Sequence, residues 1–168
     1  MGTAFNRVLA VEGPHYSARV DTTIAVLSPD QRVASLAAIR RLLSQFSPSI
    51  DALPDDVLAQ RFLEERLVLV AAAQNDLLVA IATLSLVATA SLGLVGHVDD
   101  VVVDEALRGE GIGRILMEGV HAEARRRGLR HLDLTSRPAR DAANALYQSL
   151  GYERRDTNAY RLRLEPSG

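Results

Sequence analysis

Arg108-Gly109-Glu110-Gly111-Ile112-Gly113-Arg114 is a glycine-rich heptapeptide that separates a valine-rich run from a helical pattern. Before it, Val101–Val103 form a β-branched run typical of a buried strand. After it, apolar residues recur at helical spacing as far as Ala124, and Gly128 predicts the end of the helix. The stretch therefore predicts a strand, a glycine-rich loop and a helix in succession.

This loop is suited to binding an anion. The first amide groups of a helix have no partner inside the helix and lie at the positive end of its dipole. Gly109, Gly111 and Gly113 have no Cβ, so a phosphate can approach the backbone closely. Arg108 and Arg114 flank the loop with permanent positive charges. The loop is therefore a candidate phosphate cradle.

Two other glycine-rich motifs are excluded by their spacing or composition. A Walker-type loop needs a Lys after its last Gly, and all 19 basic residues of this chain are Arg. A dinucleotide fingerprint needs a third glycine where this chain has Leu116 or Arg114, although Asp133 lies at a suitable distance downstream. The remaining alternative is that the glycines only form a tight turn.

Two motifs together resemble those of the GNAT superfamily of N-acetyltransferases. Arg108-x-x-Gly111-x-Gly113 after a valine strand is similar to that family's acyl-coenzyme A pyrophosphate motif, Q/R-x-x-G-x-G/A. Downstream, Ala142–Tyr152 resembles its helix motif A-x-x-L-Y-x-x-x-G-F/Y. The similarity extends from about Thr22 to Leu164 and is weakest in the first third of the chain.

The resemblance implies a single α/β (α+β) domain with the GNAT fold over residues 18–168, and leaves residues 1–17 unassigned. Its sheet would be mixed and mostly antiparallel, with about six or seven strands and about four helices. The central strands would be splayed to admit acyl-coenzyme A. A homodimer is also possible by resemblance.

Acetyl-coenzyme A is the co-substrate that the resemblance implies. Backbone groups of the valine strand would pair with its pantetheine arm, and Asn144 would bind the same arm. The Tyr147 hydroxyl would reach the thioester sulfur as a general acid. The implied cofactor-binding residues are Val101, Val102, Val103, Arg108, Gly109, Glu110, Gly111, Ile112, Gly113, Arg114, Asn144 and Tyr147.

The strand predicted over residues 96–104 carries two adjacent acids. Such acids are costly in an apolar strand unless they are paired or lie in a wet cleft. The resemblance implies that Asp99 acts as a base through water, next to a bulge, whereas Asp100 favours a structural role and His97 is a lesser candidate for the base. A structural role for Asp99 stays open. Alternation predicts two faces, one with His97, Asp99, Val101 and Val103 and one with Val98, Asp100 and Val102.

The other elements follow from local signals. Ser28-Pro29 predicts the start of a helix, with Ser28 as its N-cap. Leu77–Gly96 has no charged residue and could span a bilayer, but the turn at 74–76 favours two hairpin strands instead. The expected strands are 20–27, 67–73, 77–86, 131–135, 152–155 and 160–164, and the other expected helices are about 57–65 and one that starts near Asp141.

Composition limits the class of protein. At 168 residues a single domain is expected, and the net charge of −2 argues against a nucleic-acid partner. The sequence holds no Cys and four scattered His, so we expect neither thiolate chemistry nor a metal. The N-terminus lacks the pattern of a signal peptide, which favours a cytoplasmic location without a membrane partner.

The resemblance implies an acetyl-coenzyme A-dependent N-acetyltransferase that acts on a primary amine of a small molecule or peptide. Without Cys, and without Ser on a recognisable elbow, direct attack in a ternary complex is expected. The alternatives are a non-catalytic acyl-coenzyme A sensor and an interaction module with purely structural glycines. A cationic acceptor would be favoured if acids of the first third face the cleft, although a solvated acidic surface is the simpler interpretation; these acids are Asp51, Asp55, Asp56, Glu64 and Glu65.

Overall fold

The computed structural model describes residues 22–164 and divides after Thr135 into two compact units, which we describe separately. The unassigned residues 1–17 and the first residues of the strand predicted at 20–27 lie outside the described part. The first unit contains the sheet and most of the helices. The second contains one helix and the segment that follows it.

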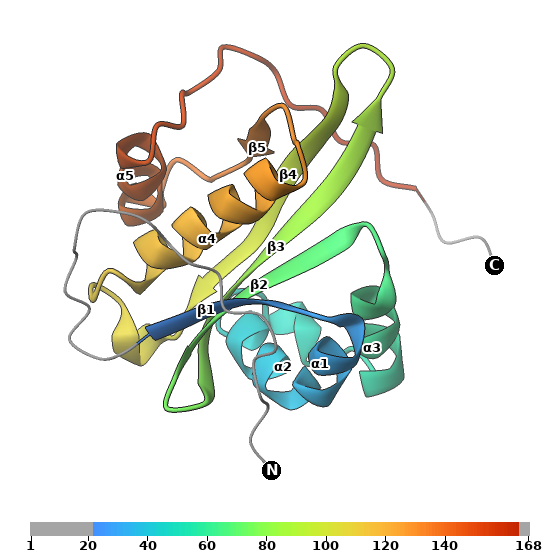
Figure 1. Ribbon diagram of the computed structural model, residues 1–168, viewed down its shortest axis with the longest axis vertical. Helices are drawn as coiled ribbons and strands as arrows, with labels where there is room; N and C mark the ends of the chain where they lie inside the picture. The colour runs from blue at the N-terminus through green and yellow to red at the C-terminus, as the bar shows by residue number, and fades with distance from the viewer. Residues whose placement is uncertain (1–21, 165–168) are drawn as a thin grey trace. The chain divides into compact units, whose positions relative to one another are not determined.

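A single five-stranded sheet forms the centre of the first unit (Figure 1). Its strands lie in chain order, with neighbours antiparallel from β1 to β4 and with β5 parallel to β4. The mixed, mostly antiparallel sheet is thereby confirmed, with fewer strands than predicted. The strands are β1 Thr22–Leu27, β2 Leu67–Gln74, β3 Leu77–Thr89, β4 Gly93–Val103 and β5 Leu132–Leu134.

Five α-helices and two short 3₁₀ helices complete the described chain. Within the first unit, α4 packs on β1 to β4, and α2 packs on β3 and β4 (Figure 1). The helices are α1 Pro29–Ala34, α2 Leu36–Ser44, α3 Asp55–Leu63, α4 Ile112–Arg126 and α5 Asp141–Ser149, with η1 Pro48–Ile50 and η2 Glu105–Leu107.

Local signals set the first helix and the first hairpin as predicted. Ser28 forms a capping box with Gln31, each side chain accepting from the other's backbone N–H. Asn75 and Asp76 both have positive φ, 48° and 62°, which is the geometry of a two-residue type I′ turn between β2 and β3. No helix in residues 22–164 is long and apolar enough to cross a membrane.

The core lies between the sheet and the helices. On one side, α2 and α3 bury Ile39, Leu42 and Leu58 against strand residues such as Leu69 and Ile81. On the other side, α4 approaches β1 so closely that a Cβ on Gly119 would lie 2.5 Å from Ile24 Cγ2. Only glycine fits there without a shift of the neighbouring strand.

The helix predicted to start at Ser28 is interrupted at Ser35, which divides it into α1 and α2. Arg32 of α1 is buried, and its guanidinium donates to the carbonyl oxygens of Leu27 and Phe62. These two bonds tie α1 to the end of β1 and to α3. The interruption therefore accompanies a tertiary contact that helical periodicity does not reveal.

The two strands predicted after α5 are wrong. Residues 152–155 and 160–164 have no regular secondary structure, and Tyr160, Leu162 and Leu164 are each more than 80% exposed. Residues 160–164 alternate between apolar and charged side chains, which is typical of a strand, but a strand forms only where a neighbouring strand accepts its hydrogen bonds. Without those two strands, the described sheet has five strands.

Candidate active site

The glycine loop leads directly into α4, the helix that the sequence predicts after it. Gly111 caps α4 in the left-handed conformation, with φ 82°, and Gly109 has φ 86°. These two glycines are explained by the turn itself, because L-residues rarely adopt positive φ. Gly113 lies within α4 without positive φ, so the turn does not require a glycine there.

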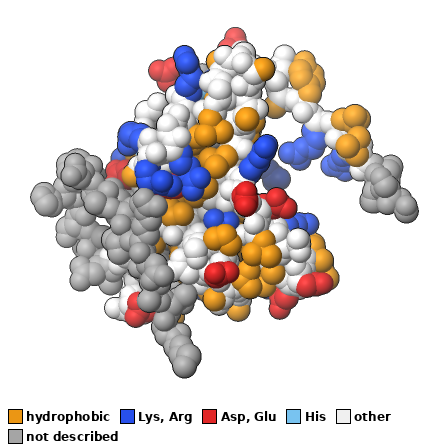
Figure 2. All heavy atoms as spheres, turned by 45° about the vertical axis from the view of Figure 1, so that its right-hand side comes forward, with side chains coloured by type: hydrophobic (Ala, Val, Ile, Leu, Met, Phe, Trp, Pro, Cys, Tyr) orange, Lys and Arg blue, Asp and Glu red, His pale blue; other side chains and the backbone are white. Residues whose placement is uncertain are grey.

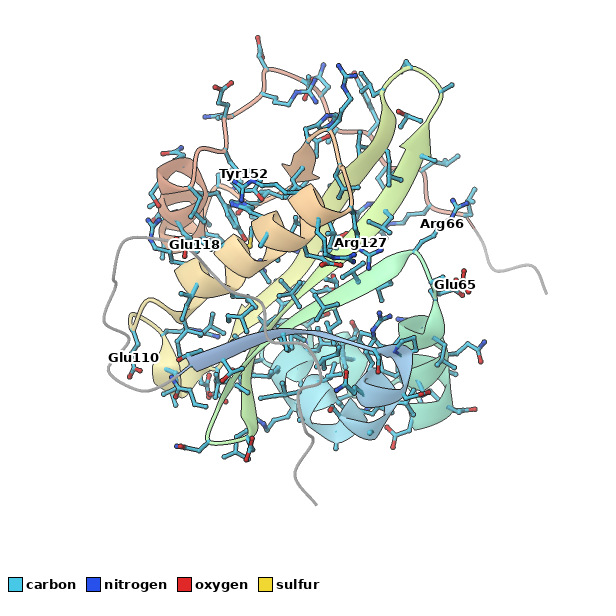
Figure 3. The ribbon with its side chains drawn as sticks, in the orientation of Figure 1. Glu65, Arg66, Glu110, Glu118, Arg127 and Tyr152 are labelled. Atoms are coloured by element: carbon cyan, nitrogen blue, oxygen red, sulfur yellow. The ribbon has the colours of Figure 1, made fainter. Side chains whose placement is uncertain are left out.

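The first turn of α4 lacks an internal counter-charge. No side chain caps it, and its first turn contains no acidic residue. Arg108 is exposed, and its Nε lies 3.4 Å from the carbonyl oxygen of Val103. Glu110 is exposed on the loop that leads into α4 (Figure 3). The positive end of the helix dipole is therefore uncompensated by its own first turn, which suits an anionic ligand.

A β-bulge interrupts the pairing of β3 with β4. Thr83 is opposite Asp99 and Ile81 is opposite Val102, so Ala82 alone faces two residues of β4. Asp100 is in this bulge and has φ 45°. An aspartate tolerates the left-handed conformation better than most residues, although it remains a strained position.

The bulge overturns the predicted faces of β4. Paired residues of an antiparallel sheet point to the same side, so Asp99 shares its face with Thr83, and Val102 shares the same face with Ile81. Val101 and Val103 therefore point to the other face, not to that of Asp99. One extra residue in a strand reverses the alternation beyond it.

Beyond the bulge, β4 has a free backbone edge. Strand β5 pairs with β4 only over Gly96–Val98. The N–H of Asp104 donates to Val79 on β3, at 2.8 Å, so by alternation Val101 and Val103 direct their backbone groups away from β3. Among the described residues no strand pairs with them on that side. Both N–H groups and the C=O of Val101 can therefore pair with an extended ligand, as an added strand would, whereas the C=O of Val103 accepts from Arg108 Nε.

A polar cluster lies beside this edge, on the face that α2 and α3 cover. The Thr83 hydroxyl donates to Asp100 Oδ2 at 3.1 Å, and His97 Nε2 lies 3.4 Å from Asp99 Oδ1. The side chain of Asp99 is 47% exposed, whereas Asp100 is half-buried. Burial raises the pKa of Asp100, the bond from Thr83 opposes this, and the charge of Asp99 adds to it. No motif or spacing in the sequence singles out Thr83.

The second unit contains the two predicted residues of α5. Asn144 Nδ2 donates to the carbonyl oxygens of Arg137 and Pro138, at 3.1 and 3.3 Å, and so anchors the segment before the helix. The rings of Tyr147 and Tyr152 make an edge contact with centroids 5.9 Å apart. Burial raises the pKa of Tyr147, partly opposed by the charge of Arg140, so its hydroxyl stays protonated at neutral pH.

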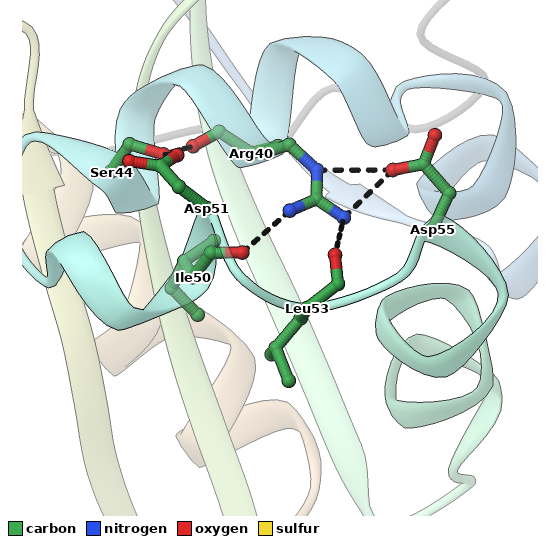
Figure 4. A network of polar contacts seen from close by, with 6 residues as sticks. All are labelled: Arg40, Ser44, Ile50, Asp51, Leu53 and Asp55. Carbon is green, nitrogen blue, oxygen red and sulfur yellow. Dashed lines mark hydrogen bonds and ion pairs between the residues drawn. The ribbon is translucent and has the colours of Figure 1, made fainter.

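Two acids that could have attracted a cationic acceptor instead stabilise the loop between α2 and α3 (Figure 4). Asp55 accepts from Nε and Nη2 of Arg40, at 3.0 and 2.7 Å. The same guanidinium donates to the carbonyl oxygens of Ile50 and Leu53. Asp51 accepts from the Ser44 hydroxyl. Acidic and basic side chains are mixed on the face of the molecule drawn in Figure 2.

A bulged strand with an edge that no described strand pairs, followed by a glycine loop and a helix whose start no side chain caps, defines an acetyltransferase-type fold. The chain belongs to the acetyltransferase (GNAT) family, whose model matches residues 36–152. In residues 22–164 no three His, Asp or Glu side chains gather as metal ligands would.

Solved structures share this fold at low identity. One is a ribosomal-protein-alanine N-acetyltransferase from Brucella melitensis biovar Abortus 2308, with 22% identity, TM-score 0.70, and coverage of 86% of this chain and 100% of that chain. A Trypanosoma brucei acetyltransferase has 25% identity, TM-score 0.69 and the same coverage. An aminoglycoside acetyltransferase from an uncultured soil metagenomic sample, in complex with sisomicin, has 15% identity, TM-score 0.76, and coverage of 86% and 97%.

Proposed function

We propose that this protein transfers the acetyl group of acetyl-coenzyme A to a primary amine of a small molecule or peptide, by direct attack in a ternary complex. The observation that carries the proposal is the run from the edge of β4 at Val101 and Val103, which no described strand pairs, to the start of α4, which no side chain caps. It offers backbone groups to an amide-containing arm and then amide dipoles to a pyrophosphate. Family membership and the fold shared with named acetyltransferases support the same activity.

The residues present fit acetyl-coenzyme A. Gly109 and Gly111 have open space where a Cβ would lie, so the backbone of the loop is accessible there, and Gly113 in the first turn of α4 also lacks a Cβ. Arg108 and Arg114 add positive charge beside the loop. Val101, Val102 and Val103 would bind the arm through their strand, with Glu110 and Ile112 completing the loop and Asn144 and Tyr147 supplied by α5. When bound, the co-substrate supplies a thioester, an acyl group activated for attack by an amine.

Groups of this chain would then transfer two protons and stabilise one developing negative charge. An amine of pKa about 10 is mostly protonated at neutral pH, so it must lose a proton before attack. Asp99, with its exposed carboxylate next to His97, takes that proton through water. The Val101 N–H stabilises the negative charge that develops on the carbonyl oxygen, and Tyr147 donates a proton to the leaving sulfur.

Release of free coenzyme A from acetyl-coenzyme A, read with a thiol reagent across a panel of amines, tests the proposal. The protein adds no background, because the chain holds no Cys. Release that depends on an amine is expected. Binding of coenzyme A without release for any amine would contradict the enzyme and favour a sensor.

Tyr147→Phe is the variant that tests the acid. We expect kcat to fall about a hundredfold, because no other proposed group protonates the sulfur, while the affinity for coenzyme A stays unchanged. Tyr160→Phe is the matched control, because Tyr160 is 90% exposed and has no proposed role. Full turnover in Tyr147→Phe would reject the acid role.

A further inference from the structure

A cavity of about 380 Å³ opens between α3 and the start of β2 in the first unit. The cavity is open to solvent, so it would hold one end of a small-molecule ligand and leave the rest exposed. Arg66 lies at the turn from α3 into β2, next to Glu65 (Figure 3). The cavity is lined by Gln60, Arg61, Glu64, Arg66, Leu67 and Ser85.

The register of the sheet relates this cavity to the candidate base. Leu67 of β2 is opposite Ser85 of β3, and Ser85 is opposite His97 of β4. Residues paired in this way point to the same face, and Leu67 packs against the core cluster on the side of α2 and α3. Ser85 and His97 therefore share the cavity's side of the sheet. The proposed base, Asp99, is opposite Thr83, two residues further along β4 and β3 on the same face. Its Oδ1 lies 3.4 Å from His97 Nε2.

The charges that line the cavity are two arginines against one glutamate. Within residues 22–164, the side chains of Arg61 and Arg66 make no ion pair or hydrogen bond. This contrasts with the arginines of the neighbouring helices, which are all engaged. Arg32 binds two carbonyl oxygens, Arg40 binds Asp55, and Arg41 binds Asp104. Arg61 and Arg66 therefore remain available to an anionic ligand.

Resting on the proposed function, we infer that the acceptor is an amine that also carries a carboxylate, as an amino acid does. Guanidinium groups recognise a carboxylate through paired hydrogen bonds, and two arginines disfavour an acceptor that is a polycation. The carboxylate binds Arg61 and Arg66, and the amine lies toward the row of His97 and Asp99. Of the five acids that would have favoured a cationic acceptor, Asp51 and Asp55 already bind Ser44 and Arg40. Glu64 lines the cavity, where it is outnumbered by the two arginines.

The test compares each common amino acid with its primary amide, which keeps the amine and removes the carboxylate. Release of coenzyme A is measured with the full chain. We expect at least one amino acid to exceed its amide in kcat/KM about tenfold or more. Arg61→Gln and Arg66→Gln should each raise the KM of that amino acid about tenfold, with the KM of its amide and of acetyl-coenzyme A unchanged. Arg125→Gln, an equal change of charge on α4, is the matched control and should change none of these values.

The outcomes separate the two proposals. Amides or polyamines that react as well as the amino acids would overturn the inference and leave the acetyltransferase standing. An unchanged amino-acid KM in both arginine variants would overturn it too. If no amine supports release while coenzyme A still binds, the proposed function fails, and the inference falls with it.

Discussion

The segment over residues 99–113 and the acceptor wall, a name we give to residues 40–66, differ in the kind of interaction that builds them. The first depends on backbone geometry: a bulge at Asp100, a free strand edge, and a left-handed cap at Gly111. The second depends on side chains, with Arg40 holding a loop together and Arg61 lining a cavity. Backbone geometry can survive extensive sequence change, whereas a wall of side chains changes with each substitution. On the proposed function, the first segment would bind the co-substrate and carry the reaction, and the second would contact the acceptor.

The largest effect is expected from a bulky residue in the glycine loop. Gly113→Trp would place an indole where a phosphate approaches the start of α4, and we expect the affinity for coenzyme A to fall more than about a thousandfold, about 4 kcal/mol. Titration calorimetry with coenzyme A measures this. Gly113→Ala is the matched control, because alanine suits a helix and adds only a methyl group. Tight binding by the Trp variant would place the phosphate site elsewhere.

The next effect concerns the base. Asp99→Asn should lower the kcat/KM of the acceptor about a hundredfold, with the affinity for coenzyme A unchanged, because asparagine cannot take the proton. Asp100→Asn, the neighbouring carboxylate, should cost less. The opposite ranking of the two variants would assign the base to Asp100, whose pKa burial raises.

A smaller effect is expected in the acceptor wall. Arg40→Ala removes the donors to Ile50, Leu53 and Asp55, and we expect the free energy of unfolding to fall by about 1–3 kcal/mol. Urea denaturation measures this value. Asp56→Asn, an exposed acid beside Asp55, should stay within about 0.5 kcal/mol of the wild type. A variant at Arg40 with full stability but an altered acceptor KM would show that these residues serve binding instead.

The smallest effect is a pH dependence of stability at the bulge. Burial raises the pKa of Asp100 in the folded state, so its ionised form destabilises the fold once the pH rises through that pKa. Asp100→Asn should therefore raise the melting temperature at about pH 8, and the gain should vanish near pH 3, where the carboxyl is protonated in both states. Melting curves of both proteins at the two pH values test this. A gain that is larger at the lower pH would contradict the assignment.

The local part of the architecture was predictable from neighbouring residues. Ser28 and Gln31 cap α1, Asn75 and Asp76 form the hairpin turn, and the loop before Ile112 begins α4. Each of these features depends on contacts within a few residues, so the pattern of side chains is sufficient. The loop and the helix start that the glycine motif forms were predictable for the same reason, because glycines and helix starts act through local backbone geometry.

The sequence alone determined the family, the order of most elements, the glycine loop and the adjacent acids. Tertiary structure alone decided which β3 residue faces Asp100, that Val101 points away from the face of Asp99, and that Asp55 binds Arg40. It also decided that residues 152–164 form no strand. The reason is physical: strand register, strand partners and ion pairs between different elements are set by contacts between residues far apart in the chain, which no local pattern encodes.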